Sequence, residues 1–281
     1  LYASGKTWSD LCAAAGHALR TAGPHEVVLR RAVGRMCHLD DALRIETYRR
    51  FVTLVEGPSL ASLSIRDQRL LRMLTATVTD KVVDKHSRLE DGVSMLWEHP
   101  QVRDEILELL KVRSKQVAHV HRSLMTHPDV PLQVHARYSR IEILAAFGIG
   151  EGAKIAAWQT GVYWADTART DLLAFTLDKT SGQFSPTTRY RDYAISRNLI
   201  HWESQSTTRA DGDTGQRYRN HQALGTHVML FARLRTDDRS FWFLGPATYV
   251  GHESELPMAV TWRLHYPLPG DLFASFAAAV A

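Results

Sequence analysis

Cysteine is scarce in this 281-residue chain, which contains only Cys12 and Cys37. Two cysteines are too few for a disulfide framework, and they are not spaced as a zinc site. No apolar run approaches the roughly 20 residues of a membrane span, and residues 1–6 lack the pattern of a signal peptide. We therefore expect a reduced, cytoplasmic protein without a membrane partner. The start at Leu1 instead of Met indicates a piece of a longer protein.

Lysine is absent from residues 184–235, although this window holds eight arginines and four acids. Tyr190, Tyr193, Trp202 and Tyr218 are interleaved with these arginines. Arginine offers a planar charged fork that suits phosphates and base edges, and aromatic rings offer faces for base stacking. The window therefore predicts a surface for nucleic acid. The competing interpretation is that the aromatic residues form core and the arginines a solvated rim.

The sequence also lacks the motifs of several enzyme classes. It contains no Gly-x-Ser-x-Gly nucleophile elbow and no His-Glu-x-x-His zinc motif. His119, His121 and His127 have no carboxylate or thiol at a convincing ligand spacing, and a helix end rich in positive charge explains them better. Gly148–Gly152 follows a predicted helix, whereas a dinucleotide-binding glycine motif follows a strand. We expect no metal, no cofactor and no catalytic residue, with a cryptic nuclease as an alternative.

The hydrophobic pattern divides the chain into two parts. Before Pro131, apolar residues recur with helical spacing in six segments, and each is expected to bury one stripe. Asp40 is the expected N-cap of the third helix, and Ser139 with Glu142 forms a capping box for a later short helix. From Gly161 onward the period becomes two, which predicts five or six strands and a small C-terminal helix.

This pattern predicts an α+β protein. A helical bundle domain at 1–128 precedes a β-barrel-like nucleic-acid-binding domain at 129–281. The second domain is expected to be a curled, mostly antiparallel β-sheet or barrel, similar in size to PUA and SRA domains. In its strand at 198–205, Ile200 and Trp202 are expected to face the core. His201, Glu203 and Gln205 share the opposite face, where polar side chains meet solvent or a ligand.

A family resemblance appears in the second part. Its motifs are, in order, Tyr138-Ser-Arg-x-Glu-Ile-Leu-Ala-Ala, Gly161-Val-Tyr-Trp, Thr170-Asp-Leu-Leu, Phe184-Ser-Pro-Thr-Thr-Arg-Tyr-x-Asp-Tyr-Ala-Ile-Ser, His201-Trp-x-Ser-Gln, Thr214-Gly-Gln-Arg-Tyr-x-Asn-His, Phe243-Leu-Gly-Pro-x-x-Tyr-Val and Met258-x-x-Thr-Trp-Arg-Leu. Over residues 138–269 the chain resembles a bacterial domain of unknown function found C-terminal to DEAD/DEAH-type (superfamily 2) helicases, often with a phospholipase-D-like nuclease. The resemblance implies helicase and nuclease domains in the same chain, and a role in phage defence, but no reaction. The Gly-x-x-x-x-Gly-Lys-Ser/Thr motif is absent, so this chain is not expected to hydrolyse ATP.

We therefore expect a non-catalytic DNA-binding accessory module of a helicase or nuclease, which contacts duplex or single-stranded DNA. Arginines would contact phosphates, and tyrosines would stack on a base. A sharper hypothesis is a reader of modified or flipped bases, with Gln205 and Asn220 reading base edges. A regulatory protein-interaction module of the helicase is the alternative from another class. The predicted nucleic-acid-binding residues are Arg189, Tyr190, Arg191, Tyr193, His201, Glu203, Gln205, Arg217, Tyr218, Arg219, Asn220 and His221.

Overall fold

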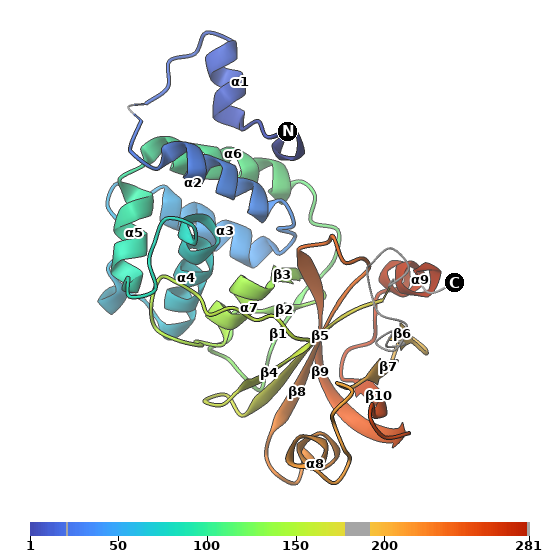
Figure 1. Cartoon of the computed structure of the whole chain (residues 1–281). Helices are drawn as coiled ribbons and strands as arrows, with labels where there is room; N and C mark the ends of the chain where they lie inside the picture. The colour runs from blue at the N-terminus through green and yellow to red at the C-terminus, as the bar shows by residue number, and fades with distance from the viewer. Residues whose placement is uncertain (21, 178–191, 280–281) are drawn as a thin grey trace. The chain divides into compact units, whose positions relative to one another are not determined.

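The computed structural model describes residues 1–20, 22–177 and 192–279. They form two compact units, Leu1–Trp158 and Gln159–Ala281 (Figure 1). Residues 129–158, which we expected in the second part, belong to the first unit. No helix within the described ranges is long and apolar enough to span a membrane.

The first unit is mostly helical (Figure 1). Its elements are η1 (Tyr2–Ser4), α1 (Trp8–Ala14), α2 (Glu26–Val33), η2 (Gly34–Met36), α3 (Ala42–Val52), η3 (Leu60–Ser62), α4 (Ile65–Thr79), α5 (Leu89–Trp97), α6 (Pro100–Ser114), β1 (Arg122–Ser123), β2 (Gln133–Val134), β3 (Arg137–Ser139) and α7 (Arg140–Ala146). Strands β1 and β2 pair antiparallel. The expectation that every strand follows Gly161 is therefore wrong, because three short strands precede it.

The helix starts show how local sequence signals act. The capping box of α7 is confirmed, because Ser139 accepts from the backbone N–H of Glu142 and Glu142 accepts from that of Ser139. The N-cap of α3 is Asp41 and not Asp40, since the Asp41 side chain accepts from the backbone N–H of Arg44. Asp40 accepts instead from the backbone N–H of Arg137, at 2.9 Å.

Helix α1 does not bury the apolar stripe that its sequence predicts. Trp8 is 42% exposed and Leu11 is 40% exposed. The helix is held through its N-terminus by the buried carboxylate of Glu105 on α6. Glu105 accepts from the backbone N–H groups of Trp8 and Ser9, at 2.6 and 2.7 Å, and from the hydroxyl of Tyr2. Polar anchoring thus replaces apolar packing at this helix.

A buried charged cluster joins α3 to α7 within the first unit. Arg44 donates to one oxygen of Glu142 at 2.9 Å, and a ring nitrogen of His38 lies 2.7 Å from the other. Burial alone would raise the pKa of Glu142, but His38 and Arg44 lower it to about 2. Glu142 therefore stays ionised while serving as both a helix cap and an ion-pair partner.

The described residues of the second unit form one sheet and two helices. Its elements are β4 (Val162–Ala165), β5 (Thr170–Thr176), β6 (Tyr193–Ala194), β7 (Leu199–Glu203), α8 (Asp213–Asn220), β8 (His227–Arg233), β9 (Ser240–Glu253), β10 (Ala259–Leu264) and α9 (Gly270–Ala278). Its strands follow the order β4-β5-β8-β9-β10-β7-β6. Helix α8 contacts β9, and α9 contacts β6 (Figure 1).

The sheet is mostly antiparallel, as predicted, but it is open and not a closed barrel. Among the described residues, β4 and β6 lie at the two ends of the strand order and do not pair with each other. Strands β5 and β8 are parallel, which the sequence analysis did not anticipate. Strand β9 is irregular next to Gly245, since the β8–β9 register shifts there and Gly245 has a φ of 92°.

One face of this sheet forms the core of the unit. Ile200 and Trp202 of β7 are 0% and 3% exposed, and Trp262 of β10 is 0% exposed. Tyr218 of α8 and Phe276 of α9 pack in the same cluster. Because side chains alternate along a strand, residues 201, 203, 261 and 263 are directed to the opposite face.

Candidate nucleic-acid interface

A row of side chains crosses the polar face of β6, β7 and β10. The register places Tyr193 beside His201, and His201 beside Thr261. The rings of Tyr193 and His201 are stacked, with centroids 4.6 Å apart and planes 14° from parallel. Tyr193 is 36% exposed. The row therefore presents a stacked pair of rings at a solvent-accessible edge of the sheet.

The row is open on the side of β9. Gly251 lies opposite Thr261, and a Cβ built on it would meet no atom within 4 Å. The predicted alternation of β7 is confirmed, because Ile200, Trp202 and Ser204 are buried while His201 and Glu203 are half-buried. The polar side chains of β7 thus lie on the face that can meet a ligand.

Acidic and basic groups lie on opposite sides of this row. Glu203 of β7 and Glu253 of β9 both lie opposite Ala259 of β10. Asp192 accepts from the backbone N–H of Glu203 at 2.9 Å, which fixes this end of β7. At the other end Arg263 is exposed, two residues from Thr261 on the same face, and no described carboxylate lies within ion-pair distance of it. The face therefore has an end that accepts hydrogen bonds and a cationic end.

Arg263 is not among the residues predicted to bind nucleic acid. It alternates with the buried Trp262 along β10. The missing information was that β10 lies next to β7, since only that pairing brings Arg263 onto the face of His201.

Arg217, a predicted phosphate contact, forms an ion pair within the second unit. Its Nε and Nη2 donate to the two carboxylate oxygens of Asp171 at 2.7 and 2.9 Å. The Asp171 side chain is fully buried, and the guanidinium lies 4.3 Å from the ring centroid of Trp164. Burial raises the pKa of Asp171 while Arg217 opposes that rise. This pair joins α8 to β5.

Tyr218 and His221 also have internal contacts in place of the predicted ligand contacts. Tyr218 is 1% exposed and meets Trp202 and Trp262 edge to face, so neither face is free for a base. His221 is 5% exposed, and its Nε2 accepts from the backbone N–H of Tyr249 at 3.2 Å. Burial lowers the pKa of His221. Both residues dock α8 and the turn after it onto the sheet.

The remaining predicted residues differ in position. Gln205, Arg219 and Asn220 are exposed, and Asn220 donates to the side chain of Gln216 at 2.7 Å. Gln205 follows β7 beyond its last paired residue. Arg189, Tyr190 and Arg191 lie outside the described residues.

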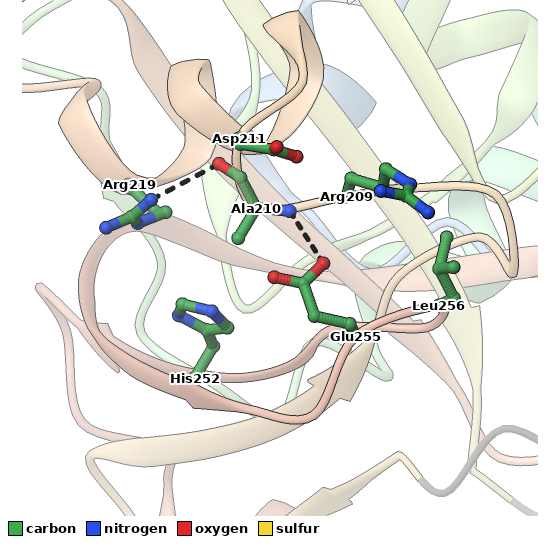
Figure 2. A pocket seen from close by; sticks show the side chains of 7 residues that line it. All are labelled: Arg209, Ala210, Asp211, Arg219, His252, Glu255 and Leu256. Atoms are coloured by element: carbon green, nitrogen blue, oxygen red, sulfur yellow. Dashed lines mark hydrogen bonds between the residues drawn. The ribbon is translucent and has the colours of Figure 1, made fainter.

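A pocket of about 550 Å³ lies where β7 leads into α8 and β9 turns into β10 (Figure 2). Figure 2 shows Arg219 and His252 on one side, Arg209 and Leu256 on the other, and Glu255 between them. Glu255 accepts from the backbone N–H of Ala210 at 3.0 Å, and Arg219 donates to the carbonyl of Ala210 at 3.3 Å.

The charges of this pocket are balanced. Arg209 and Arg219 face Asp211 and Glu255, and neither arginine forms an ion pair within the described part of the chain. Such a lining can bind a group that has both hydrogen-bond acceptors and donors. Because the two arginines and two carboxylates balance, the charge of the pocket does not favour an anionic ligand. The sequence analysis named Arg219 alone of these residues, because the pocket depends on a fold contact between α8 and the β9–β10 turn.

Gly215 allows α8 to lie against the segment that precedes it. A Cβ at this position would lie 2.0 Å from the carbonyl oxygen of Arg209 and 2.8 Å from the Cα of Ala210. The first turn of α8 therefore lies directly on the backbone of Arg209 and Ala210, which line the pocket. Glycine is needed here for close approach.

Comparison with known proteins identifies a family for the second unit and part of the first. A family model described as "Domain of unknown function (DUF3427)" matches residues 132–276, which is more than half of the chain. No curated protein matches the sequence. Among the described residues, no group of three or more His, Cys, Asp or Glu side chains is arranged to hold a metal ion.

Proposed function

The chain belongs to the family described as a domain of unknown function (DUF3427), and within that family we propose that it is a non-catalytic DNA-binding module. The observation that carries this proposal is the stacked pair Tyr193–His201 on the open polar face of the sheet. Aromatic side chains on a sheet face bind unstacked bases in several nucleic-acid-binding folds. A base would extend the stack on the exposed side of Tyr193.

The two ends of the polar face suit the two parts of a nucleotide. Glu203 and Glu253 can accept hydrogen bonds from the amino group of a base, as acidic residues do from cytosine N4. Arg263 can contact a phosphate at the opposite end. The charge gradient therefore orients the ligand, with its base toward the acids and its backbone toward Arg263. Gln205 is placed beyond Glu203, where an amide could distinguish a modified or flipped base.

The proposed setting is a longer polypeptide that also holds helicase and nuclease domains. This part of the proposal rests on the motif resemblance, and the polar face gives it a physical role. A module that stacks single bases would retain the strand that a helicase exposes. Because the stacked ring must reach an unpaired base, we expect single-stranded DNA to bind more tightly than duplex DNA of equal length.

The test is equilibrium binding of fluorescent oligonucleotides to the full chain, followed by anisotropy. Tyr193→Ala should weaken single-strand binding about 5- to 150-fold, because stacking contributes roughly 1–3 kcal/mol per base. Arg263→Gln should lower the slope of log affinity against log salt by about 0.7, the value for one phosphate contact on a single strand. Oligonucleotides with modified bases, compared with and without Gln205→Ala, test the reading hypothesis.

Arg239→Gln is the matched control, since Arg239 is exposed in the turn before β9 and lies outside the polar face. It should leave affinity and salt slope unchanged. A Mg²⁺ incubation of the same oligonucleotides tests the nuclease alternative through strand cleavage. Absence of binding to every oligonucleotide at low salt would refute the proposal and favour the protein-interaction alternative.

A further inference from the structure

The glycine loop Gly148-Ile-Gly-Glu-Gly152 has no role in the polar face, yet it borders a pocket of its own. It follows α7, so it is not the glycine motif of a dinucleotide fold. Within the first unit it faces α4 and the start of α5 across a pocket of about 610 Å³. Its lining combines basic side chains with apolar ones.

The loop is held in a fixed shape. Gly148 and Gly150 both have a φ of 70°, a conformation that favours glycine. Arg72 donates to the carbonyls of Ile149 and Gly152 at 3.0 and 2.9 Å. A Cβ on Gly152 would lie 2.6 Å from the carbonyl oxygen of Ser87. The loop is therefore tied at both ends, and its glycines leave bare backbone along this wall.

The pocket carries more positive than negative charge. Four permanent cations line it, namely Arg69, Arg72, Lys85 and Arg88, against the two carboxylates of Glu90 and Glu151. Among the described residues, none of these four cations forms an ion pair with a carboxylate. A pocket of this composition favours an anionic ligand.

Burial makes two of these cations unusual. Arg72 is 4% exposed, and its hydrogen-bond partners are neutral carbonyl oxygens. Burial lowers the pKa of Arg72 to about 10, and it also lowers the pKa of Arg69. Arg72 has a structural role because it holds the loop. Arg69 is half-buried against Gly148 and has no such role, since no hydrogen bond joins it to another described residue.

Two further features define the ligand. The start of the nine-residue helix α5 borders the pocket through Arg88, Leu89 and Glu90, and Asp91 fixes it by accepting from the backbone N–H of Arg88 at 2.7 Å. Leu60, Ile65, Leu89 and Ala145 supply an apolar part of the lining, and Ile65 is 55% exposed. The volume lies within the range of small-molecule sites.

We propose that this pocket binds a phosphate ester of nucleotide size, with the phosphate at Arg69 and the apolar part of the ligand against Leu60 and Ile65. The site is independent of the proposed DNA-binding face, because it lies wholly in the first unit and uses other residues. The chain would then have a small-molecule binding site in addition to the proposed nucleic-acid-binding face.

Isothermal titration of the full chain tests this site with four probes: inorganic phosphate, adenosine, adenosine 5′-monophosphate, and a short 5′-phosphorylated oligonucleotide. We expect the monophosphate to bind at least ten-fold more tightly than either phosphate or adenosine. Arg69→Gln should weaken that binding at least ten-fold. Arg31→Gln, an exposed arginine on α2, should leave it unchanged, and so should Arg263→Gln, which separates this site from the polar face.

If Arg69→Gln fails to fold, the double variant Lys85→Gln/Arg88→Gln replaces it, since both side chains are exposed. Absence of monophosphate binding, or equal binding by the charge-removing variants, would overturn the proposal. If inorganic phosphate bound as tightly as adenosine 5′-monophosphate, the proposed contact of the ligand with Leu60 and Ile65 would be refuted. Binding of the oligonucleotide without the monophosphate would overturn its assignment to a small ligand.

Discussion

Replacing Arg217 by methionine should destabilise the second unit strongly. The same replacement at an exposed arginine of this helix should have little effect. Arg217 is the bidentate partner of Asp171, and the Asp171 side chain is fully buried. Methionine keeps much of the side-chain volume and removes the charge. The carboxylate would then be buried without its cation.

The expected loss is about 3–5 kcal/mol, which is typical of removing one partner from a buried ion pair. The contact of the guanidinium with Trp164 adds roughly 0.5–1 kcal/mol. With a urea dependence of about 1–3 kcal/mol per molar, the unfolding midpoint should fall by at least about 1 M. Urea unfolding can be monitored by hydrogen exchange of the β5 and α8 amides. These amides report the stability of the second unit separately from that of the first.

The loss should depend on pH in a defined direction. Burial raises the pKa of Asp171, and Arg217 opposes that rise, so the pKa rises further in the variant. A carboxyl group whose folded pKa exceeds its unfolded value stabilises the fold below the unfolded value. That stabilisation is lost as pH rises through the folded pKa. The variant should therefore lose more stability at pH 7.5 than at pH 5.

Two further variants complete the experiment. Arg219→Met, two residues along the same helix and exposed, should change stability by less than about 1 kcal/mol. The double variant Asp171→Asn/Arg217→Met should recover part of the loss because no buried charge remains. A loss below about 1 kcal/mol for Arg217→Met, or an equal loss at both pH values, would refute the reasoning.

Other variants probe the two units. Glu142→Gln should cost the first unit about 3–5 kcal/mol in urea unfolding, because it removes the carboxylate that lies closest to the buried Arg44. In the native protein, the Glu142 pKa of about 2 means that its contribution is present above the unfolded pKa. That contribution is lost as pH falls toward 2, which acid titration by circular dichroism would detect. Gly215→Ala should cost roughly 1–3 kcal/mol in thermal unfolding, since its Cβ would overlap the carbonyl of Arg209. An unchanged melting temperature would contradict the close approach.

The hydrophobic pattern of the sequence predicted those helices and strands whose apolar residues are numerous enough to repeat with a helical or strand period. The alternation of β7 placed Trp202 in the core and His201 on the polar face, and both positions are confirmed. Helix α8 is not among the elements that the sequence pattern predicted. It has eight residues, and Gly215 and Tyr218 are its buried ones, so one apolar side chain cannot reveal a helical period.

Long-range contacts limited prediction of the site. The Arg217–Asp171 contact depends on the helical phase of α8, and sequence alone left Arg217 as one arginine among eight. A signal was present in β5, where Asp171 is the one charged residue and precedes four apolar ones. An acid at such a position needs a buried cationic partner. Tyr193 and His201 meet through the β6–β7 register, which depends on a connection that the alternation does not specify.

The parallel pairing of β5 and β8 has a consequence for how this module can vary. Parallel neighbours cannot be joined by a tight turn and require a crossover of a dozen or more residues. Here the crossover from Thr176 to His227 holds β6, β7 and α8, and hence His201 and the salt-bridged Arg217. The crossover, which carries part of the proposed DNA-binding face, therefore also allows β8 to run parallel to β5. Shortening it to a hairpin would reverse that strand, so truncations that remove the interface should also prevent the native topology.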